Sequence, residues 1–156
     1  MGRILKVGGI GLAVLLVVIQ FFRPERSNPA MDPAGDITAQ MSVPPAVRSI
    51  LERSCYDCHS SKTRWPWYTN VAPVSWLVVH DVNQGREHLN LSEWGSYKHG
   101  RRVSRLDVMI NLVDKGEMPP KSYLLMHGDA ALGEADKDIL CAWAEQQSDS
   151  LTAAGK

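Results

Sequence analysis

Two cysteines and a histidine stand together in the segment Cys55-Tyr56-Asp57-Cys58-His59. On one helical turn this spacing puts both sulfur atoms on the same side, within reach of the two vinyl groups of a haem. The histidine directly after the second cysteine then projects its imidazole at the iron, and C-x-x-C-H is the attachment signature of a c-type haem. The sequence therefore predicts one covalent haem c, bonded to Cys55 and Cys58, with His59 as an iron ligand.

Other uses of a cysteine pair fit the remaining sequence less well. A zinc site needs two further ligands at short spacing, but Cys141 is isolated and the histidines after the motif are widely separated. A thioredoxin-like pair needs a strand–helix–strand setting, and a helical pattern surrounds this pair instead. A disulfide framework favours an even number of cysteines, whereas this chain has three. Haem attachment is the interpretation that accounts for the motif.

The residues before the motif have the pattern of an amphipathic helix. Pro44 and Pro45 suit a first helical turn, where a missing amide hydrogen costs nothing. Side chains at helical spacing then form one face that leads to the motif. These positions are Val47, Ile50, Leu51 and Ser54. We expect a helix that carries the attachment site at its end.

Met118 is the leading candidate for a second iron ligand. It lies in Gly116-Glu117-Met118-Pro119-Pro120, where the glycine suits a helix end and the prolines stiffen the chain. A rigid loop that holds a thioether fixed suits iron, and methionine ligation raises the reduction potential, which favours electron transfer. The helix predicted before this loop has its apolar positions at Leu106, Met109, Ile110 and Val113.

Two alternatives to this ligand stay open. Met118 could be a gap-filling core methionine, the role that we assign to Met109 and Met126. A histidine could take the position instead, with His127 as the next candidate and His80 after it. The sequence favours Met118 because helix breakers and polar residues flank it.

Aromatic residues follow the motif closely. We expect Trp65, Trp67 and Tyr68 to help wall the haem from water, because a haem is a large apolar body in a small domain. Their N–H and O–H groups could also reach a propionate. The alternative is that they belong to the general core of the domain. A helix is predicted directly after them, over residues 74–89.

Two further segments have alternative interpretations. Residues 98–105 hold four basic side chains, which could pair with propionates or dock an acidic redox partner, although a solvated loop is the simpler interpretation. Cys141 lies in a helix predicted over residues 133–147, where we expect a buried small hydrophobe rather than a reactive thiol. This last helix is expected to pack against the first helix of the domain.

Residues 7–22 form an apolar run that only Gln20 interrupts. Counted from Ile4, nineteen helical residues span about 28 Å, close to the thickness of a hydrocarbon core. Basic residues precede the run, so the positive-inside tendency predicts a cytoplasmic N-terminus and an exported domain. A cleaved signal peptide is the alternative, but its nearest small-residue cleavage site, at Ala30, lies beyond several charged residues.

The chain as a whole is predicted to be all-α. We expect a transmembrane helix in residues 1–22, a Pro-rich linker in 23–36, a cytochrome c-like haem domain in 37–147 and a polar tail in 148–156. The 17 Lys and Arg residues are balanced by 17 Asp and Glu residues. This balance argues against a nucleic-acid partner, which would need a basic face.

Several segments in combination match a known pattern: CYDCH at 55–59, WPWY at 65–68, APVSW at 72–76, DVNQGREHLNLSEW at 81–94, GEMPP at 116–120 and YLLMH at 123–127. Through them the chain resembles the bacterial haem-binding domain proteins, single-haem relatives of cytochrome c with an N-terminal anchor. The resemblance covers residues 44–145, and it implies haem binding by the CYDCH segment and matches Met118 to the distal methionine of cytochromes c. Gly128, in place of a proline, and Gly133, in place of a Ser or Thr cap, depart from the family pattern.

These features predict a membrane-tethered carrier of single electrons on the periplasmic side of the cytoplasmic membrane. Its partners would be the membrane and redox proteins of unspecified identity. A peroxidase-like enzyme is one alternative, and it would need an open sixth site with a distal acid–base residue, for which His127 is the candidate. A gas or redox sensor, in which a labile sixth ligand is displaced, is the other.

Overall fold

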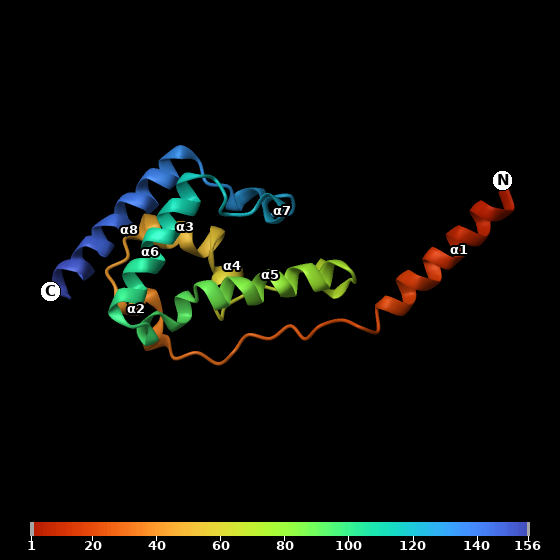
Figure 1. The fold of residues 1–156 in the computed structure, drawn as a ribbon, viewed down its shortest axis with the longest axis horizontal. Helices are drawn as coiled ribbons and strands as arrows, with labels where there is room; N and C mark the ends of the chain where they lie inside the picture. Colours follow the sequence, from red (N-terminus) through yellow and green to blue (C-terminus); the bar gives the residue numbers. More distant parts are fainter. Residues whose placement is uncertain (1, 156) are drawn as a thin grey trace.

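A computed structural model describes residues 2–155, and within that range every regular element is helical, as predicted. Figure 1 shows a helical domain and, apart from it, the N-terminal helix α1. The α-helices are α1 (Gly2–Ile19), α2 (Ile37–Gln40), α3 (Pro45–Ser54), α4 (Tyr56–His59), α5 (Val74–His88), α6 (His99–Asp114), α7 (Lys121–Leu124) and α8 (Glu134–Ala154). Short 3-10 helices join them: η1 (Pro33–Gly35), η2 (Trp67–Asn70), η3 (Leu91–Ser96) and η4 (Gly128–Ala130).

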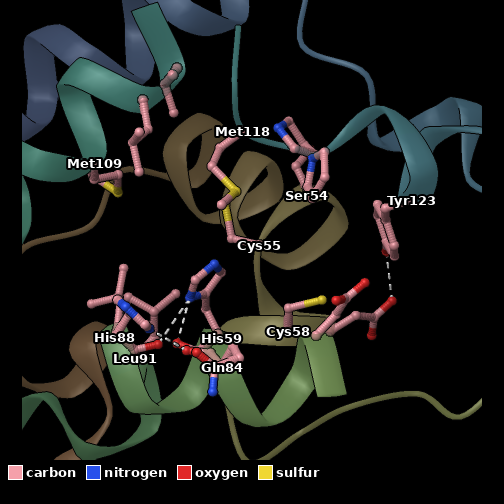
Figure 2. A pocket seen from close by; sticks show the side chains of 18 of the residues that line it. Ser54, Cys55, Cys58, His59, Gln84, His88, Leu91, Met109, Met118 and Tyr123 are labelled. Carbon is pink, nitrogen blue, oxygen red and sulfur yellow. Dashed lines mark hydrogen bonds between the residues drawn. The ribbon is translucent and has the colours of Figure 1, made fainter. Parts of the chain in front are cut away.

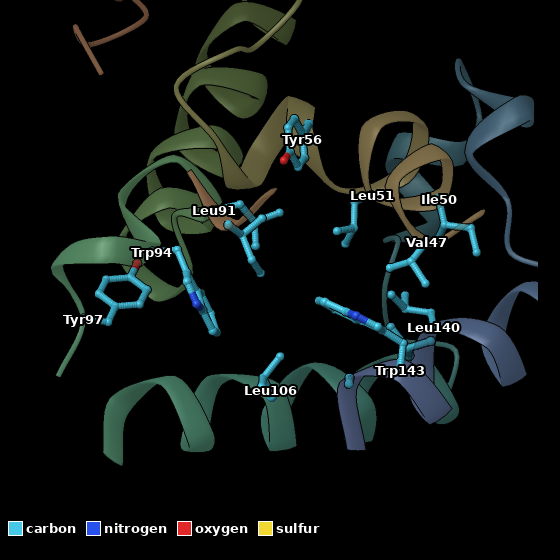
Figure 3. Close-up of a cluster of buried hydrophobic side chains, with 13 residues drawn as sticks. Val47, Ile50, Leu51, Tyr56, Leu91, Trp94, Tyr97, Leu106, Leu140 and Trp143 are labelled. Atoms are coloured by element: carbon cyan, nitrogen blue, oxygen red, sulfur yellow. The ribbon is translucent and has the colours of Figure 1, made fainter. Parts of the chain in front are cut away.

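The core of the domain lies between α3, α6, α8 and η3. Helices α6 and α8 run side by side and make the most extensive contact between two helices (Figure 1). The indole of Trp143 is buried among them, and its N–H donates to the backbone oxygen of Ser42 at 3.0 Å. Figure 3 shows the buried side chains that these four segments contribute, among them Val47, Ile50, Leu51, Leu91, Trp94, Leu106, Leu140 and Trp143.

Helix α3 confirms the predicted helix before the motif. It begins at Pro45, and its buried positions are the four that the spacing indicated. It ends at Ser54 because the backbone of Cys55 leaves helical geometry, with φ −124° and ψ −40°. The chain then resumes as the single turn of α4, which carries the rest of the motif. The helix predicted over residues 74–89 is confirmed as α5.

The basic segment 98–105 is not a solvated loop, as the sequence favoured, but the N-terminal half of α6. The guanidinium of Arg102 donates to the backbone oxygen of Gly95 at 2.9 Å, which ties this turn to η3. The guanidinium of Arg101 lies 4.6 Å from the centre of the Tyr97 ring. Arginine packs in this way because its long apolar stem covers buried surface while its charged end stays near water. The basic composition of residues 98–105 therefore did not distinguish a helix from a loop.

Helix α8 extends beyond its predicted end at residue 147 and includes most of the predicted polar tail, residues 148–156. Ser148 is buried, and its hydroxyl donates to the Asp107 carboxylate at 2.8 Å. Leu151 packs against the core cluster. These tertiary contacts stabilise helical structure that the polar composition did not indicate. As expected, α8 contacts α3, and it contacts α6 more extensively.

Helix α1 is long and apolar enough to cross a membrane, and none of its residues is buried. The segment that follows it contacts the domain at several points. The amide of Asn28 donates to the backbone oxygen of Thr63 at 2.9 Å, and Arg86 donates to both Ser27 and Asn28. Asp36, at the end of this segment, is only 2% exposed. The Pro-rich segment therefore lies along the domain rather than extending freely from it.

Candidate functional site

A cavity of about 350 Å³ lies between the motif, α5 and the end of α6. Its size falls in the range of small-molecule and cofactor sites. Figure 2 shows Cys55, Cys58, His59 and Met118 around it, so the structure brings together the four residues that the sequence predicted to hold haem. Apolar side chains make up much of the remaining wall, among them Leu89, Leu91, Val108, Met109, Leu112, Val113 and Leu132.

The two motif thiols reach the cavity from a tightly held turn. The backbone N–H groups of Cys58 and His59 both donate to the carbonyl oxygen of Cys55, at 3.2 and 2.9 Å. Burial raises the pKa of the Cys55 thiol to about 12 and that of Cys58 to about 11, so both are neutral thiols at neutral pH. None of the three cysteines, all of which lie in the described part of the chain, forms a disulfide. Cys141 lies outside the cavity and packs against the core.

The imidazole of His59 is held by helix α5. Its Nδ1 lies 3.0 Å from the carbonyl oxygens of both Gly85 and Leu89. Carbonyl oxygens only accept hydrogen bonds, so Nδ1 carries the hydrogen and Nε2 keeps its lone pair. Burial lowers the pKa of this imidazole, although the two backbone bonds oppose that effect. His59 is therefore a neutral, oriented ring with its free nitrogen available to a metal.

Gly85 permits the close packing of α5 against the motif. A Cβ atom at this position would lie 2.5 Å from the backbone oxygen of Cys58, a distance that real Cβ atoms do not adopt. Without this close approach the carbonyl of Gly85 would not reach His59. Sequence analysis missed this role. The available signal was a glycine inside a predicted helix, which often marks a close backbone approach when it has no other explanation.

Met118 enters the cavity from the loop after α6, and Figure 2 shows its side chain across from His59. Helix α6 ends where Gly116 adopts a left-handed backbone with φ 67°, as the sequence predicted. The backbone N–H of Met118 then donates to the carbonyl oxygen of Leu112 at 3.2 Å. Met109, assigned to the core from the sequence, packs against the core and also lines this wall.

Two buried polar atoms on the cavity wall lack a partner in the described part of the chain. They are Nε of Arg105 and Oγ of Ser54. Buried polar groups are nearly always hydrogen-bonded in folded proteins, so an orphaned pair at a cavity suggests a polar group that enters it. Arg105 also belongs to the basic segment for which propionate pairing was one interpretation.

The predicted pocket residues Trp65, Trp67 and Tyr68 do not line the cavity, and this prediction needs correction. Trp67 is 73% exposed, and the hydroxyl of Tyr68 pairs with His127 Nε2 at 3.2 Å. The chain leaves the cavity after the motif and packs η2 against α5, whose cavity-lining residues begin only at Asp81. Proximity to the motif in sequence therefore did not translate into proximity to the cavity.

The histidines considered as alternative ligands also lie outside the cavity lining. The ring of His127 stacks on that of Tyr123, with ring centres 4.0 Å apart. His80 is exposed to solvent. Of the three candidates for a second ligand, only Met118 lines the cavity among residues 2–155. Met109 and His88 also line it, and Nδ1 of His88 pairs with the backbone oxygen of Gln84 at 2.8 Å.

Tyr123 and Asp57 form a further part of the site that the sequence did not indicate. Both line the cavity, and the Tyr123 hydroxyl donates to the Asp57 carboxylate at 2.9 Å. The same carboxylate accepts hydrogen bonds from the backbone and guanidinium of Arg64, and the backbone oxygen of Asp57 accepts from Thr63. Because Asp57 is one of the two residues between the cysteines, these bonds fix the motif turn to α7 and to the segment after α4.

Comparison with known proteins gives a family but no individual relative. A family model described as a haem-binding domain matches residues 14–146 of the chain. No curated protein and no solved structure matches it significantly.

Proposed function

Because the chain belongs to the haem-binding domain family, we propose that it is a c-type cytochrome that transfers single electrons from one covalently attached haem. Haem binding follows from the family. The observation that carries the rest is the meeting of two thiols, an oriented imidazole and a thioether at one largely apolar cavity. These groups, together with the orphaned Arg105 Nε, fit a haem with its vinyl groups, iron and propionates.

The thiols of Cys55 and Cys58 would fasten the haem. Each would hold it through one thioether bond, so that the cofactor stays in the domain covalently. The backbone bonds from Cys58 and His59 to the carbonyl oxygen of Cys55 fix the turn from which both cysteines line the cavity.

His59 and Met118 would bind the haem iron. The hydrogen bonds from Nδ1 to α5 fix the ring and leave Nε2 for the iron, and such bonds also increase the basicity of a ligating imidazole. The thioether of Met118 lines the same cavity as the His59 imidazole. The bound haem supplies the one-electron chemistry between ferrous and ferric iron, and a methionine ligand favours the ferrous state and raises the potential.

Arg105 would neutralise a propionate. Its Nε is buried without a partner in residues 2–155, and its charge would pair with a carboxylate that the apolar wall does not stabilise. This ion pair between Arg105 and a propionate would allow the domain to bury the haem without leaving the propionate charge unpaired.

Helix α1 would tether the domain to the cytoplasmic membrane, with the haem on the periplasmic side. Its length and composition suit a single span, and Arg3 and Lys6 near its start favour a cytoplasmic N-terminus. A tether raises the local concentration of the carrier near membrane-bound redox enzymes, which we propose as its partners.

The test of this function is the behaviour of the full chain purified from cells that mature c-type cytochromes. We expect one haem per chain, a low-spin ferric spectrum with a methionine–iron charge-transfer band, and a reversible titration of one electron. High-spin ferric iron, or prompt binding of cyanide and carbon monoxide, would contradict the carrier and favour an enzyme or a sensor with an open sixth position.

A further inference from the structure

Exposed apolar side chains gather at one end of the domain. Outside the N-terminal segment, most of the large hydrophobic residues with high exposure lie on the stretch from η2 into α5 or just after α7. Trp67 is 73% exposed and Leu125 is 84% exposed, values that are costly for a surface in water. We call this set the docking surface, and it consists of Trp67, Val71, Val74, Trp76, Leu77, Leu125 and Met126.

The two parts of the docking surface belong together. The Tyr68 hydroxyl in η2 pairs with Nε2 of His127, which directly follows Met126. Figure 1 shows α7 and the start of α5 at the end of the domain that faces α1. The exposed residues of both segments therefore lie at one end rather than being scattered over the molecule.

This surface adjoins the point where α1 ends. The side-chain amide of Gln20 both donates to and accepts from the backbone of Ala72, at 3.0 and 2.9 Å. The indole N–H of Trp76 donates to the carbonyl oxygen of Phe22 at 2.7 Å. If α1 spans a bilayer, these bonds place the docking surface at the level of the lipid headgroups.

The charges around the docking surface suit anionic headgroups. No acidic residue occurs between Asp57 and Asp81, a stretch that contains Arg64 and also Lys62, which pairs with Asp36. Glu25 and Asp129 are the acidic residues close in sequence to the rest of the surface. Arg64 keeps 70% of its side chain exposed while it pairs with Asp57. Arg23, just after α1, is exposed and donates to the backbone oxygen of Asn70. Basic residues beside exposed tryptophan and aliphatic side chains are characteristic of surfaces that rest in a membrane interface.

We propose that the docking surface lies in the headgroup region of the same membrane that α1 crosses, and that it fixes the orientation of the haem domain there. The inference rests on the membrane tether of the proposed function. Tryptophan suits this position because its ring is apolar and its N–H is polar. Anionic lipid is the partner that suits both the apolar side chains of the docking surface and the exposed basic residues Arg23 and Arg64 beside it.

Helix α5 connects the docking surface to the cavity. Val74 lies on the docking surface and Gly85 on the cavity wall, and the two are about 16 Å apart along α5 at ~1.5 Å per residue. The docking surface would therefore hold the haem at a fixed short distance from the membrane, where membrane-bound redox enzymes present their own cofactors.

The experiment uses the full chain in vesicles of phosphatidylethanolamine and phosphatidylglycerol. A photoactivatable benzoylphenylalanine replaces Trp67 in one variant and Ile139 in the control. Ile139 is a matched control because it is 44% exposed but lies on α8, outside the docking surface. After irradiation, mass spectrometry measures lipid adducts, and flotation through a density gradient after an alkaline wash measures membrane insertion.

We expect both variants to float with the vesicles, and the lipid adduct at position 67 to exceed that at position 139 several-fold. If both float but position 67 forms no more lipid adduct than position 139, the docking surface is wrong and the tether stands. Protein dimers cross-linked through position 67 would overturn it in favour of a second copy. If neither variant floats, the tether itself is contradicted and the docking surface with it.

Discussion

The wall that carries the motif and the wall that carries Met118 border one cavity, but the chain fixes them by different means. On the motif wall, His59 donates to the carbonyl oxygens of Gly85 in α5 and of Leu89 just after it, and the Asp57 side chain accepts from Tyr123 and Arg64. On the opposite wall, Met118 follows a left-handed glycine and makes one backbone bond back to α6. His59 is therefore oriented by its own hydrogen bonds, whereas Met118 is positioned mainly by the path of a loop.

Replacement of Gly85 by alanine should break the motif wall and produce the largest effect. The new Cβ would lie 2.5 Å from the Cys58 oxygen, and the backbone there has to shift. We expect a loss of at least about 1–3 kcal/mol in the free energy of unfolding, measured by denaturant titration, together with a lower yield of haem-loaded protein. Gly100→Ala is the control, because its Cβ meets nothing within 4 Å. Equal stability of the two variants would refute the role given to Gly85.

The opposite wall is tested by Met118→Leu against Met109→Leu. Both substitutions conserve volume, so the packing cost of each should stay below about 1.5 kcal/mol. Only the first should remove the methionine–iron charge-transfer band and lower the reduction potential, since both residues line the wall but Met118 alone is assigned to iron. Optical spectra and a redox titration measure these quantities. A band that survives in Met118→Leu, or disappears in Met109→Leu, would reassign the ligand.

Arg105→Gln should have a smaller effect on the same potential. Removal of a positive charge beside a propionate stabilises the ferric state, so the potential should fall, by roughly 40 mV for a loss of about 1 kcal/mol. Arg101→Gln is the control, because Arg101 is exposed and rests on the Tyr97 ring rather than on the cavity. Equal shifts of the potential in the two variants would contradict a specific pair between Arg105 and a propionate, because they would reflect only the change in net charge.

The smallest effect concerns Asp36, which supports the motif turn through a hydrogen bond from Tyr56. Burial alone would raise the pKa of this carboxyl, but bonds from Lys62 and Thr38 outweigh it and the net pKa is lowered. The unfolded chain therefore binds the proton first as the pH falls below about 4, and the folded state loses stability as the pH passes through the lowered value.

Denaturation of the wild type and of Asp36→Asn between pH 6 and pH 2.5 measures this contribution. The stability difference between them should shrink as the pH falls through the acid range, since the wild-type carboxyl becomes neutral. A difference that stays constant across this range would show that ionisation of Asp36 does not contribute.

The motif wall could be predicted from sequence because local spacing specifies it. The apolar positions of α3 and the ligand spacing at 55–59 are set by helical geometry, and the glycine and prolines around Met118 encode the loop directly. The all-α fold followed from the same periodicity. In each case the information lies within a few residues of the feature that it predicts.

The parts that could not be predicted depend on contacts between distant segments. The clash that makes Gly85 necessary involves Cys58, and the bond that fixes Asp57 comes from Tyr123. The aromatic residues after the motif were assigned to the pocket because of their composition, yet η2 packs against α5 outside the cavity. Tertiary packing also turned the basic segment before Leu106 into helix.

Covalent attachment is the central claim, and the intact mass of the denatured chain tests it most directly. Protein from a host that matures c-type cytochromes should carry the mass of one haem and keep its red colour in denaturant. The Cys55→Ala/Cys58→Ala double variant should lose both, whereas Cys141→Ala should keep them. A colourless wild-type chain of unmodified mass would contradict the proposed attachment.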